Sequence, residues 1–163
     1  MRRAVFLDRD GVINRERGEH TWRLEDFEIL PDVATALLEL QRAGFALVVV
    51  TNQSGIGLGL YGHADVERLH GYLHDMLSKH GVQLTAIYYC PHHPTGGHCL
   101  CRKPGSLLLE RAIARYGIDP AGSVMIGDRE RDLHAAEGAG VRGILVPANA
   151  PLLPVITEHV LNA

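Results

Sequence analysis

Short apolar runs alternate along this chain with segments of helical periodicity, and this alternation constrains the fold more than any other feature. The strand-like runs cover residues 4–7, 45–50, 86–89, 124–126 and 143–146. The helical stripes cover residues 33–40, 66–77, 109–116 and 132–137. Strands separated by helical patterns form parallel sheets covered on both faces. The sequence therefore predicts an α/β fold, a Rossmann-like parallel sheet with helices on both faces.

The length and composition fit one folding unit. The chain has 163 residues, of which 46% are hydrophobic and 21% charged, close to the averages for globular proteins. No repeat or Pro/Gly/Ser-rich linker divides it, so we expect a single domain over residues 1–163. No insertion is long enough for a large cap domain. The segment after the last strand is short, and whether it carries a final helix stays open.

Charge and hydropathy exclude two classes of partner. The formal net charge is −3 and no basic stripe is visible, which argues against nucleic acid as the main ligand. The apolar runs are too short to span a bilayer. The N-terminal string Met1-Arg2-Arg3 leads directly into a strand-like run without a signal peptide's apolar region. We expect a cytoplasmic protein, and a monomer.

Polar motifs lie close beyond four of the expected strands, where parallel sheets bind their ligands. They are Asp8-Arg9-Asp10-Gly11, residues 51–55, Arg102-Lys103-Pro104, and Gly127-Asp128 with Asp132. In the first motif, one carboxylate can attack phosphorus and form an aspartyl phosphate. The other can protonate the leaving alkoxide and then activate water. Taken alone, the tetrapeptide fits an Asx-type turn equally well.

The other three motifs supply complementary chemistry. Thr51 and the residues after it offer a hydroxyl, amides and backbone N–H groups to phosphate oxygens. Arg102 and Lys103 can neutralise a transferring phosphoryl group, and Asp128 can complete a Mg²⁺ site. Each has an ordinary alternative, namely a polar loop, a solvated cation pair and a helix N-cap. Their order along one sheet favours a common site.

In this order and placement, the four motifs resemble those of the haloacid-dehalogenase superfamily. The resemblance covers nearly the whole chain. It implies a Mg²⁺-dependent phosphatase that acts through an aspartyl phosphate. It assigns Asp8 as the nucleophile and Asp10 as the general acid and base, with Thr51 and Lys103 holding the phosphoryl group.

The resemblance also implies where the metal binds. Mg²⁺ would be held by Asp8, Asp128 and the backbone carbonyl of Asp10, with Asp132 outside the direct ligands. The metal would relieve the repulsion between an anionic nucleophile and an anionic phosphate.

All three cysteines fall between residues 90 and 101, with three of the ten histidines. An odd, tightly grouped set is a poor disulfide framework. Three thiolates and one imidazole would make a closed, structural Zn²⁺ site. The expected ligands are Cys90, His92, Cys99 and Cys101. His93 and His98 stay open as alternatives to His92, and three reduced thiols without metal are the other interpretation.

Such a loop directly before Arg102 resembles the branch that contains heptose bisphosphate phosphatases and histidinol-phosphate phosphatases. The strings at residues 6–11, 50–56 and 88–94 are most similar to the heptose enzymes. This resemblance implies hydrolysis of the 7-phosphate of D-glycero-D-manno-heptose 1,7-bisphosphate in lipopolysaccharide synthesis. Histidinol phosphate is the alternative substrate. A non-catalytic phospholigand-binding module is the alternative from another class, although Asp8 and Asp10 argue against it.

The position of residues within that branch implies further substrate contacts. These are Glu16, Arg17, Gly18, Glu19, Asn52, Gln53, Ser54, Arg102, Lys103 and Arg129. Glu19 and its neighbours replace the string usual in that loop, and Arg129 stands where lysine is common. If Lys103 faces the reacting phosphate, Arg102 and Arg17 are left to meet a second, remote phosphate.

Overall fold

Five parallel strands form the single sheet of this protein. The structure, a computed structural model, describes residues 1–163. The strand order is β3-β2-β1-β4-β5, and every neighbouring pair is parallel. The strands are β1 (Ala4–Leu7), β2 (Ala46–Asn52), β3 (Ala86–Cys90), β4 (Val124–Gly127) and β5 (Arg142–Leu145). The prediction of a parallel α/β sheet is confirmed, and β1 coincides with its expected residues.

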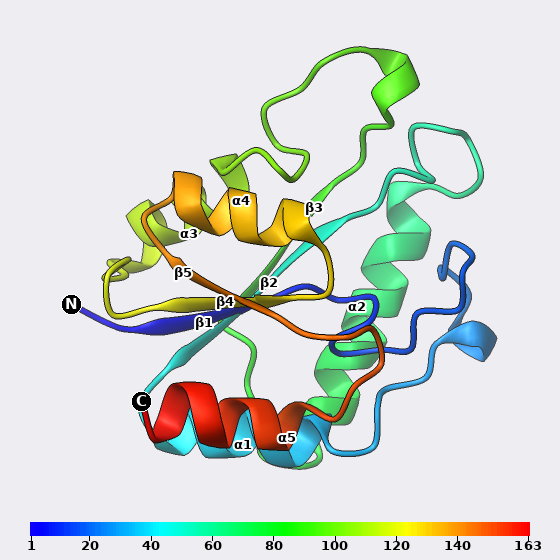
Figure 1. Ribbon diagram of the computed structural model, residues 1–163. Helices are drawn as coiled ribbons and strands as arrows, with labels where there is room; N and C mark the ends of the chain where they lie inside the picture. Colours follow the sequence, from blue (N-terminus) through cyan, green and yellow to red (C-terminus); the bar gives the residue numbers. More distant parts are fainter.

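Helices cover both faces of the sheet (Figure 1). They are α1 (Val33–Arg42), α2 (His63–Ser78), α3 (Leu107–Tyr116), α4 (Glu130–Gly138) and α5 (Leu152–Ile156). Helices α1, α2 and α5 pack on one face, and α3 and α4 pack on the other. None of them is both long and apolar enough to cross a membrane. The layers match the architecture expected from the alternating pattern.

Alternation along β1 divides its side chains between the two cores. Val5 and Leu7 join the core under α1, α2 and α5, whereas Ala4 and Phe6 join the core under α3 and α4. All four side chains are fully buried, because successive residues of a strand point to opposite faces and both faces are covered. The central strand is therefore fixed on both sides, which gives the residues after it a rigid base.

A C-terminal helix, left open by the sequence, is present. Helix α5 is continued by a π-helical turn, Thr157–Leu161, and packs against α1. Leu152 and Ile156 of α5 are buried in the same core as α1. The helix is hard to recognise because it is short and begins directly after Pro151. It lies beside α1 in the layer of helices that covers one face of the sheet (Figure 1).

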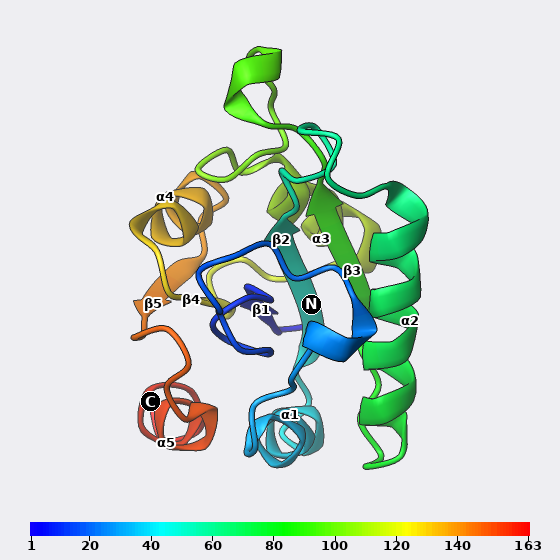
Figure 2. The same ribbon diagram turned by 90° about the vertical axis from the view of Figure 1, so that its right-hand side faces the viewer.

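The strand order changes direction between β1 and β4, and ligands of open α/β sheets bind beside such a switch point. Asp8 follows β1 and Asp128 follows β4, so the two carboxylates leave neighbouring strands at the same edge. The loop after β3 rises above this edge (Figure 2). Helix α4 begins there as well, immediately after the segment that carries Asp128.

Candidate active site

A cavity of about 260 Å³ that no hydrophobic residue lines lies at the carboxyl edge of the sheet. Eleven of the residues that line it were expected at the site: Asp8, Asp10, Glu16, Gly18, Glu19, Asn52, Gln53, Ser54, Arg102, Asp128 and Arg129. Thr51 and Lys103 are buried beside it and do not line it. A larger cavity of about 590 Å³ shares Arg102 with it but holds none of the aspartates of the four motifs. The smaller cavity is therefore the candidate active site.

Lys103 is buried beside this cavity and contacts Asp8, which lines it. Its Nζ is 3.0 Å from Asp8 Oδ1, 2.7 Å from Asp132 Oδ1 and 2.7 Å from the carbonyl oxygen of Val50. Burial alone would lower the pKa of Lys103, but the two carboxylates outweigh it and raise that pKa. The ammonium group therefore stays charged beside Asp8. Asn52 fixes the lysine's backbone, since its amide pairs with the N–H and C=O of Lys103 at 3.0 and 3.2 Å.

Three carboxylates lie close together at the site, with one oxygen of each within 4.8 Å of the others; they belong to Asp8, Asp128 and Asp132. Burial raises the pKa of Asp8 to about 7; Lys103 opposes this rise, and the other aspartates add to it. Asp132 is fully buried and does not line the cavity, whereas Asp8 and Asp128 do, so these two carboxylates are the ones that a cation in the cavity can reach. Crowded, buried carboxylate oxygens with insufficient positive charge are a donor set that fits Mg²⁺.

Gly11 lets Asp128 approach the first motif. A Cβ at this position would lie 2.3 Å from Asp128 Oδ2, which is shorter than any real contact. The residue also has φ +88°, a left-handed conformation that favours glycine. The glycine of the first motif is thus required by close packing as well as by the turn.

Asp10 is held by three side chains. Arg9 and Asn14 each donate to its Oδ1 at 2.9 Å, and Gln53 donates to its Oδ2 at 3.2 Å. Burial would raise the pKa of Asp10, but the Arg9 guanidinium and these hydrogen bonds outweigh it and lower that pKa. The carboxylate is therefore ionised and fixed in orientation, as a base that accepts a proton from water must be.

Arg9 is fully buried and joins the first motif to two other segments. Its Nη2 donates to the carbonyl oxygen of Thr21 at 2.8 Å, and its Nη1 lies 3.1 Å from His70 Nε2. Burial and the neighbouring guanidinium lower the pKa of His70 to about 3, so the imidazole is neutral and accepts this hydrogen bond. Sequence reasoning missed the role of Arg9, because a buried arginine between two aspartates leaves no periodic signal.

Gln53 was expected to contact substrate, and the structure uses its whole amide inside the protein. Its Nε2 also donates to Thr51 Oγ1 at 2.9 Å, and its Oε1 accepts from the Tyr61 hydroxyl at 2.8 Å. Burial raises the pKa of Tyr61 to about 12, which keeps it a donor. Tyr61 was missed because it belongs to no motif. A Cβ on Gly55 would lie 2.1 Å from its ring, so that glycine makes room for it.

Arg17 was expected to contact substrate, and its side chain lies elsewhere. It does not line the cavity, and its Nη2 lies 3.4 Å from Glu19 and 3.7 Å from Asp26. Arg131, which was not singled out, lines the cavity instead. Arg131 lies in the first turn of α4, three residues after Asp128, and this short spacing from the fourth motif was the signal that could have found it.

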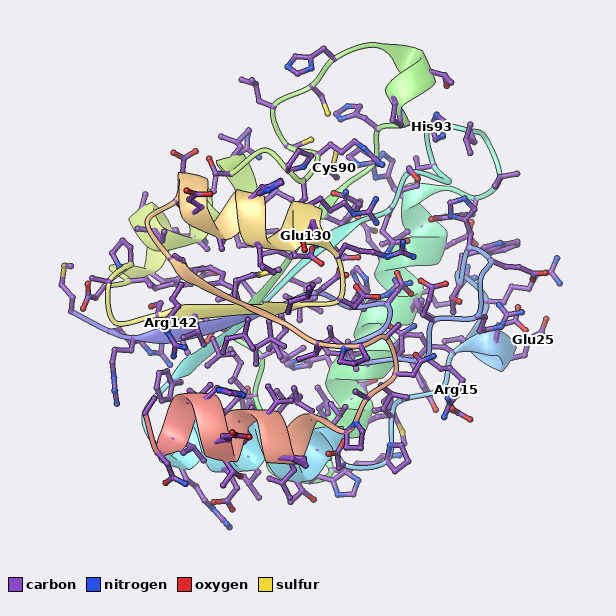
Figure 3. All side chains as sticks on the ribbon, in the orientation of Figure 1. Arg15, Glu25, Cys90, His93, Glu130 and Arg142 are labelled. Carbon is purple, nitrogen blue, oxygen red and sulfur yellow. The ribbon has the colours of Figure 1, made fainter.

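The loop after β3 gathers the three cysteines and one histidine. The Sγ atoms of Cys90, Cys99 and Cys101 and His92 Nδ1 all lie within 4.8 Å of one another. Two of the three sulfur–sulfur distances, 3.8 Å for Cys90–Cys99 and 3.9 Å for Cys99–Cys101, match the roughly 3.8 Å edge of a tetrahedron with 2.3 Å Zn–S bonds, whereas Cys90 and Cys101 lie closer, at 2.8 Å. Figure 3 shows sulfur atoms gathered near Cys90, where the loop leaves the sheet.

The two competing histidines lie outside this cluster. His93 Nδ1 is 2.8 Å from Thr95 Oγ1 and accepts from the Thr95 N–H at 3.2 Å, within the short 3₁₀ turn Pro94–Gly96. His98 is exposed and is not among the four grouped ligands. Of the three histidines, His92 is thus the one brought to the sulfur atoms. The set fits a closed four-ligand Zn²⁺ site.

Comparison with known proteins places the chain in a family. It is 44% identical over 147 residues to the D-glycero-beta-D-manno-heptose-1,7-bisphosphate 7-phosphatase of Haemophilus ducreyi, covering 86% of this chain and 80% of that protein. It is 43% identical over 158 residues to the Escherichia coli K12 protein of the same name, covering 93% and 82%. The chain belongs to the heptose-1,7-bisphosphate 7-phosphatase family.

Structural comparison and the superfamily agree with this family. The crystal structure of D,D-heptose 1,7-bisphosphate phosphatase from B. bronchiseptica, complexed with magnesium and phosphate, matches with a TM-score of 0.84. The two chains are 34% identical, and the match covers 97% of this chain and 87% of the other. A family model described as HAD-hydrolase-like matches residues 100–150. The resemblance to the haloacid-dehalogenase superfamily and to its heptose bisphosphate phosphatases is confirmed.

Proposed function

We propose that this chain is a Mg²⁺-dependent phosphatase that removes the 7-phosphate of D-glycero-D-manno-heptose 1,7-bisphosphate. The observation that carries the proposal is the position of Asp8 at a polar cavity, with charged Lys103 on one side and Asp128 on the other. Asp10, held in place by its neighbours, lines the same cavity. The proposed substrate comes from the names of the relatives, and the proposed reaction comes from the arrangement of the residues at the cavity.

The reaction proceeds in two displacements. The Asp8 carboxylate attacks phosphorus, and the bond from phosphorus to the sugar oxygen breaks. Asp10 gives a proton to that oxygen, after the incoming phosphate dianion has favoured the protonated form of its carboxyl. Asp10 then takes a proton from water, which attacks the aspartyl phosphate and releases inorganic phosphate and the Asp8 carboxylate. Lys103 stays charged throughout and stabilises the transferring phosphoryl group, with Thr51 beside it.

Asp8, Asp128 and the backbone carbonyl of Asp10 would hold the Mg²⁺. When bound, the metal neutralises charge between the nucleophile and the phosphate. The crowding of Asp8, Asp128 and Asp132 supports this assignment, because hard oxygen donors in this number suit Mg²⁺ better than softer metals.

The loop after β3 would hold a structural Zn²⁺ on Cys90, His92, Cys99 and Cys101. All four ligand positions come from the protein, which leaves none for substrate. The loop ends at Arg102 and Lys103, so a fixed loop sets where these two cations enter the site. Three reduced thiols also suit a cytoplasmic location, which we propose together with a monomeric, single-domain chain over residues 1–163.

The experiment that tests the substrate is a kinetic panel with added Mg²⁺. We expect kcat/KM for heptose 1,7-bisphosphate to exceed that for heptose 7-phosphate and for histidinol phosphate by at least about tenfold, or roughly 1.4 kcal/mol. The reason is that neither heptose 7-phosphate nor histidinol phosphate, an amino-alcohol phosphate, offers a second phosphate to the free cations of the cavity. A higher kcat/KM for histidinol phosphate would replace the heptose proposal with its alternative.

A further inference from the structure

We propose that Arg131 is a specificity-determining residue that, together with Arg102, binds the second phosphate of the substrate, the one that is not hydrolysed. This inference rests on the proposed function and deepens it. Lys103 is occupied at the reacting end by Asp8 and Asp132, so a remote phosphate needs other cations. The cavity offers three arginines, Arg102, Arg129 and Arg131.

Arg17, the partner that the sequence suggested for Arg102, is not available for this role. Its guanidinium faces Glu19 and Asp26, and it lies outside the residues that line the cavity. Recruiting it would require breaking these contacts. Of the three cavity arginines, Arg129 is the least suited, because its side chain is 59% exposed and leans toward Asp128 at 3.9 Å.

Arg102 and Arg131 are both without an anionic partner. Neither takes part in any ion pair of the protein within 4.0 Å. Arg102 Nη1 and Arg131 Nε are buried and have no hydrogen-bond partner. Buried donors of a charged group without partners are costly, and an anionic ligand removes that cost. Two such arginines on one cavity therefore indicate an anion site.

The two arginines reach the cavity from different elements. Arg102 ends the loop after β3, and Arg131 stands in the first turn of α4. Figure 3 labels Glu130, the first residue of that helix, at the end of α4 that faces the loop. The helix start also contributes partial positive charge, which adds to the attraction for an anion. Guanidinium groups on two sides can meet a phosphate with paired hydrogen bonds.

The consequence for catalysis is selectivity. Phosphate held at the far end of the substrate supplies binding energy that orients the reacting phosphate toward Asp8. A monophosphate lacks this anchor. Arg131 thus determines how strongly a bisphosphate is preferred over the corresponding 7-monophosphate, whereas the displacement at phosphorus itself depends on Asp8, Asp10 and Lys103.

The test compares Arg131→Gln with the wild type on heptose 1,7-bisphosphate and heptose 7-phosphate. We expect the ratio of the two kcat/KM values to fall at least about tenfold in the variant, as for loss of one charged contact. Arg111→Gln is the matched control, because it removes the same charge from an exposed position of α3 outside the cavity. Arg131→Lys keeps the positive charge but loses the paired N–H donors of the guanidinium group, and it should give an intermediate ratio.

A binding measurement separates this role from a structural one. In the Asp8→Asn background, calorimetric titration should show Arg131→Gln weakening the bisphosphate more than the monophosphate. Equal losses for both substrates, or an unchanged ratio in an enzyme that prefers the bisphosphate, would overturn this inference alone. A wild-type enzyme that prefers histidinol phosphate would overturn the proposed function and this inference with it.

Discussion

Three side chains hold Asp10, and one of them, Gln53, is itself held by Tyr61. The Tyr61 hydroxyl occupies Gln53 Oε1, so the amide presents Nε2 to Asp10 and Thr51. Without that donor, the amide could turn its oxygen toward Asp10, and two acceptors would then face each other. The orientation of the general acid and base therefore depends on a tyrosine outside every motif.

Gln53→Glu tests this arrangement. The change is isosteric, and it places a second carboxylate where Nε2 now lies 3.2 Å from Asp10 Oδ2. We expect kcat to fall at least about tenfold, because the repulsion displaces Asp10 from the leaving group. Gln83→Glu, with the same change at an exposed position, is the control. Steady-state kcat within about twofold of the wild type in Gln53→Glu would refute a positioning role for Gln53.

For single residues, the sequence predicted where a side chain lies in the fold better than it predicted which groups that side chain contacts. Asp8 and Asp128 directly follow strands, and Thr51 is the second-to-last residue of β2; parallel strands bring such residues to one edge, so their meeting was predictable. An amide such as Gln53 fits a ligand and a scaffold equally well on sequence grounds. Arg17 is paired with two acids outside the cavity, whereas Arg131 lines the cavity without an acidic partner, and no local sequence pattern distinguishes these two outcomes.

At the scale of elements, the loop of residues 16–21 is held at both ends. Arg9 holds the Thr21 carbonyl, as described above, and Asn149 holds the peptide of Glu16. Asn149 Oδ1 accepts from Glu16 N at 2.6 Å, and Nδ2 donates to Glu16 O at 3.1 Å. The backbone N–H of Asn149 donates to Gly11 O at 2.8 Å, and its φ of +67° suits asparagine or glycine. The segment after β5 thus positions the rim of the cavity.

Asn149→Gly tests this connection, since glycine keeps the backbone conformation and removes only the side-chain hydrogen bonds. We expect KM for the bisphosphate to rise roughly tenfold, as for loss of two modest hydrogen bonds, with a smaller change in kcat. The inhibition constant of inorganic phosphate reports the reacting end and should change less than KM. Asn162→Gly, at an exposed position outside the cavity, is the control. An unchanged KM in Asn149→Gly would show that the loop needs no such anchor.

The loop after β3 gives a second prediction at this scale. Elemental analysis of protein purified without chelators should find about one zinc per chain. Cys99→Ser should lose the zinc and most of the activity, because the loop leads directly into Lys103. His98→Ala should keep both, since His98 lies outside the ligand cluster. Zinc near zero in the wild type would contradict the structural-metal proposal without touching the Mg²⁺ site.

Elements themselves were predictable to different degrees. The apolar runs that became β1 and β2 and the stripe that became α2 are long and regular enough to recognise. Helix α5 was not, because its five residues, Leu152–Ile156, span little more than one turn and include a proline. Its stability comes from packing on α1, which is a long-range contact.

At the scale of the whole molecule, the active site depends on one sheet edge that both cores support. Asp8 and Asp128 follow β1 and β4, which are neighbours in the sheet and buried on both faces. Ligands that join these two carboxylates therefore stabilise the folded chain as a unit, because they bind the native state and not the unfolded one.

Thermal unfolding measures this coupling. Mg²⁺ with inorganic phosphate at about 100 times their dissociation constants should add about 2.7 kcal/mol of stability. For a chain of this length the corresponding rise in Tm is roughly 5–10 °C. Asp128→Asn should remove most of the Mg²⁺-dependent part, whereas Asp75→Asn, an exposed aspartate of α2, should leave it in place. A rise in Tm that is equal in all three proteins would place the metal elsewhere.

The central claim is that Asp8 carries the phosphoryl group during turnover. Acid quenching of the enzyme during hydrolysis of heptose 1,7-bisphosphate, followed by peptide mass spectrometry, tests it most directly. We predict one phosphoryl group on the peptide that contains Asp8, and neither phosphopeptide nor turnover in a folded Asp8→Asn variant. A phosphoryl group on another residue, or near-wild-type turnover by Asp8→Asn, would contradict the account.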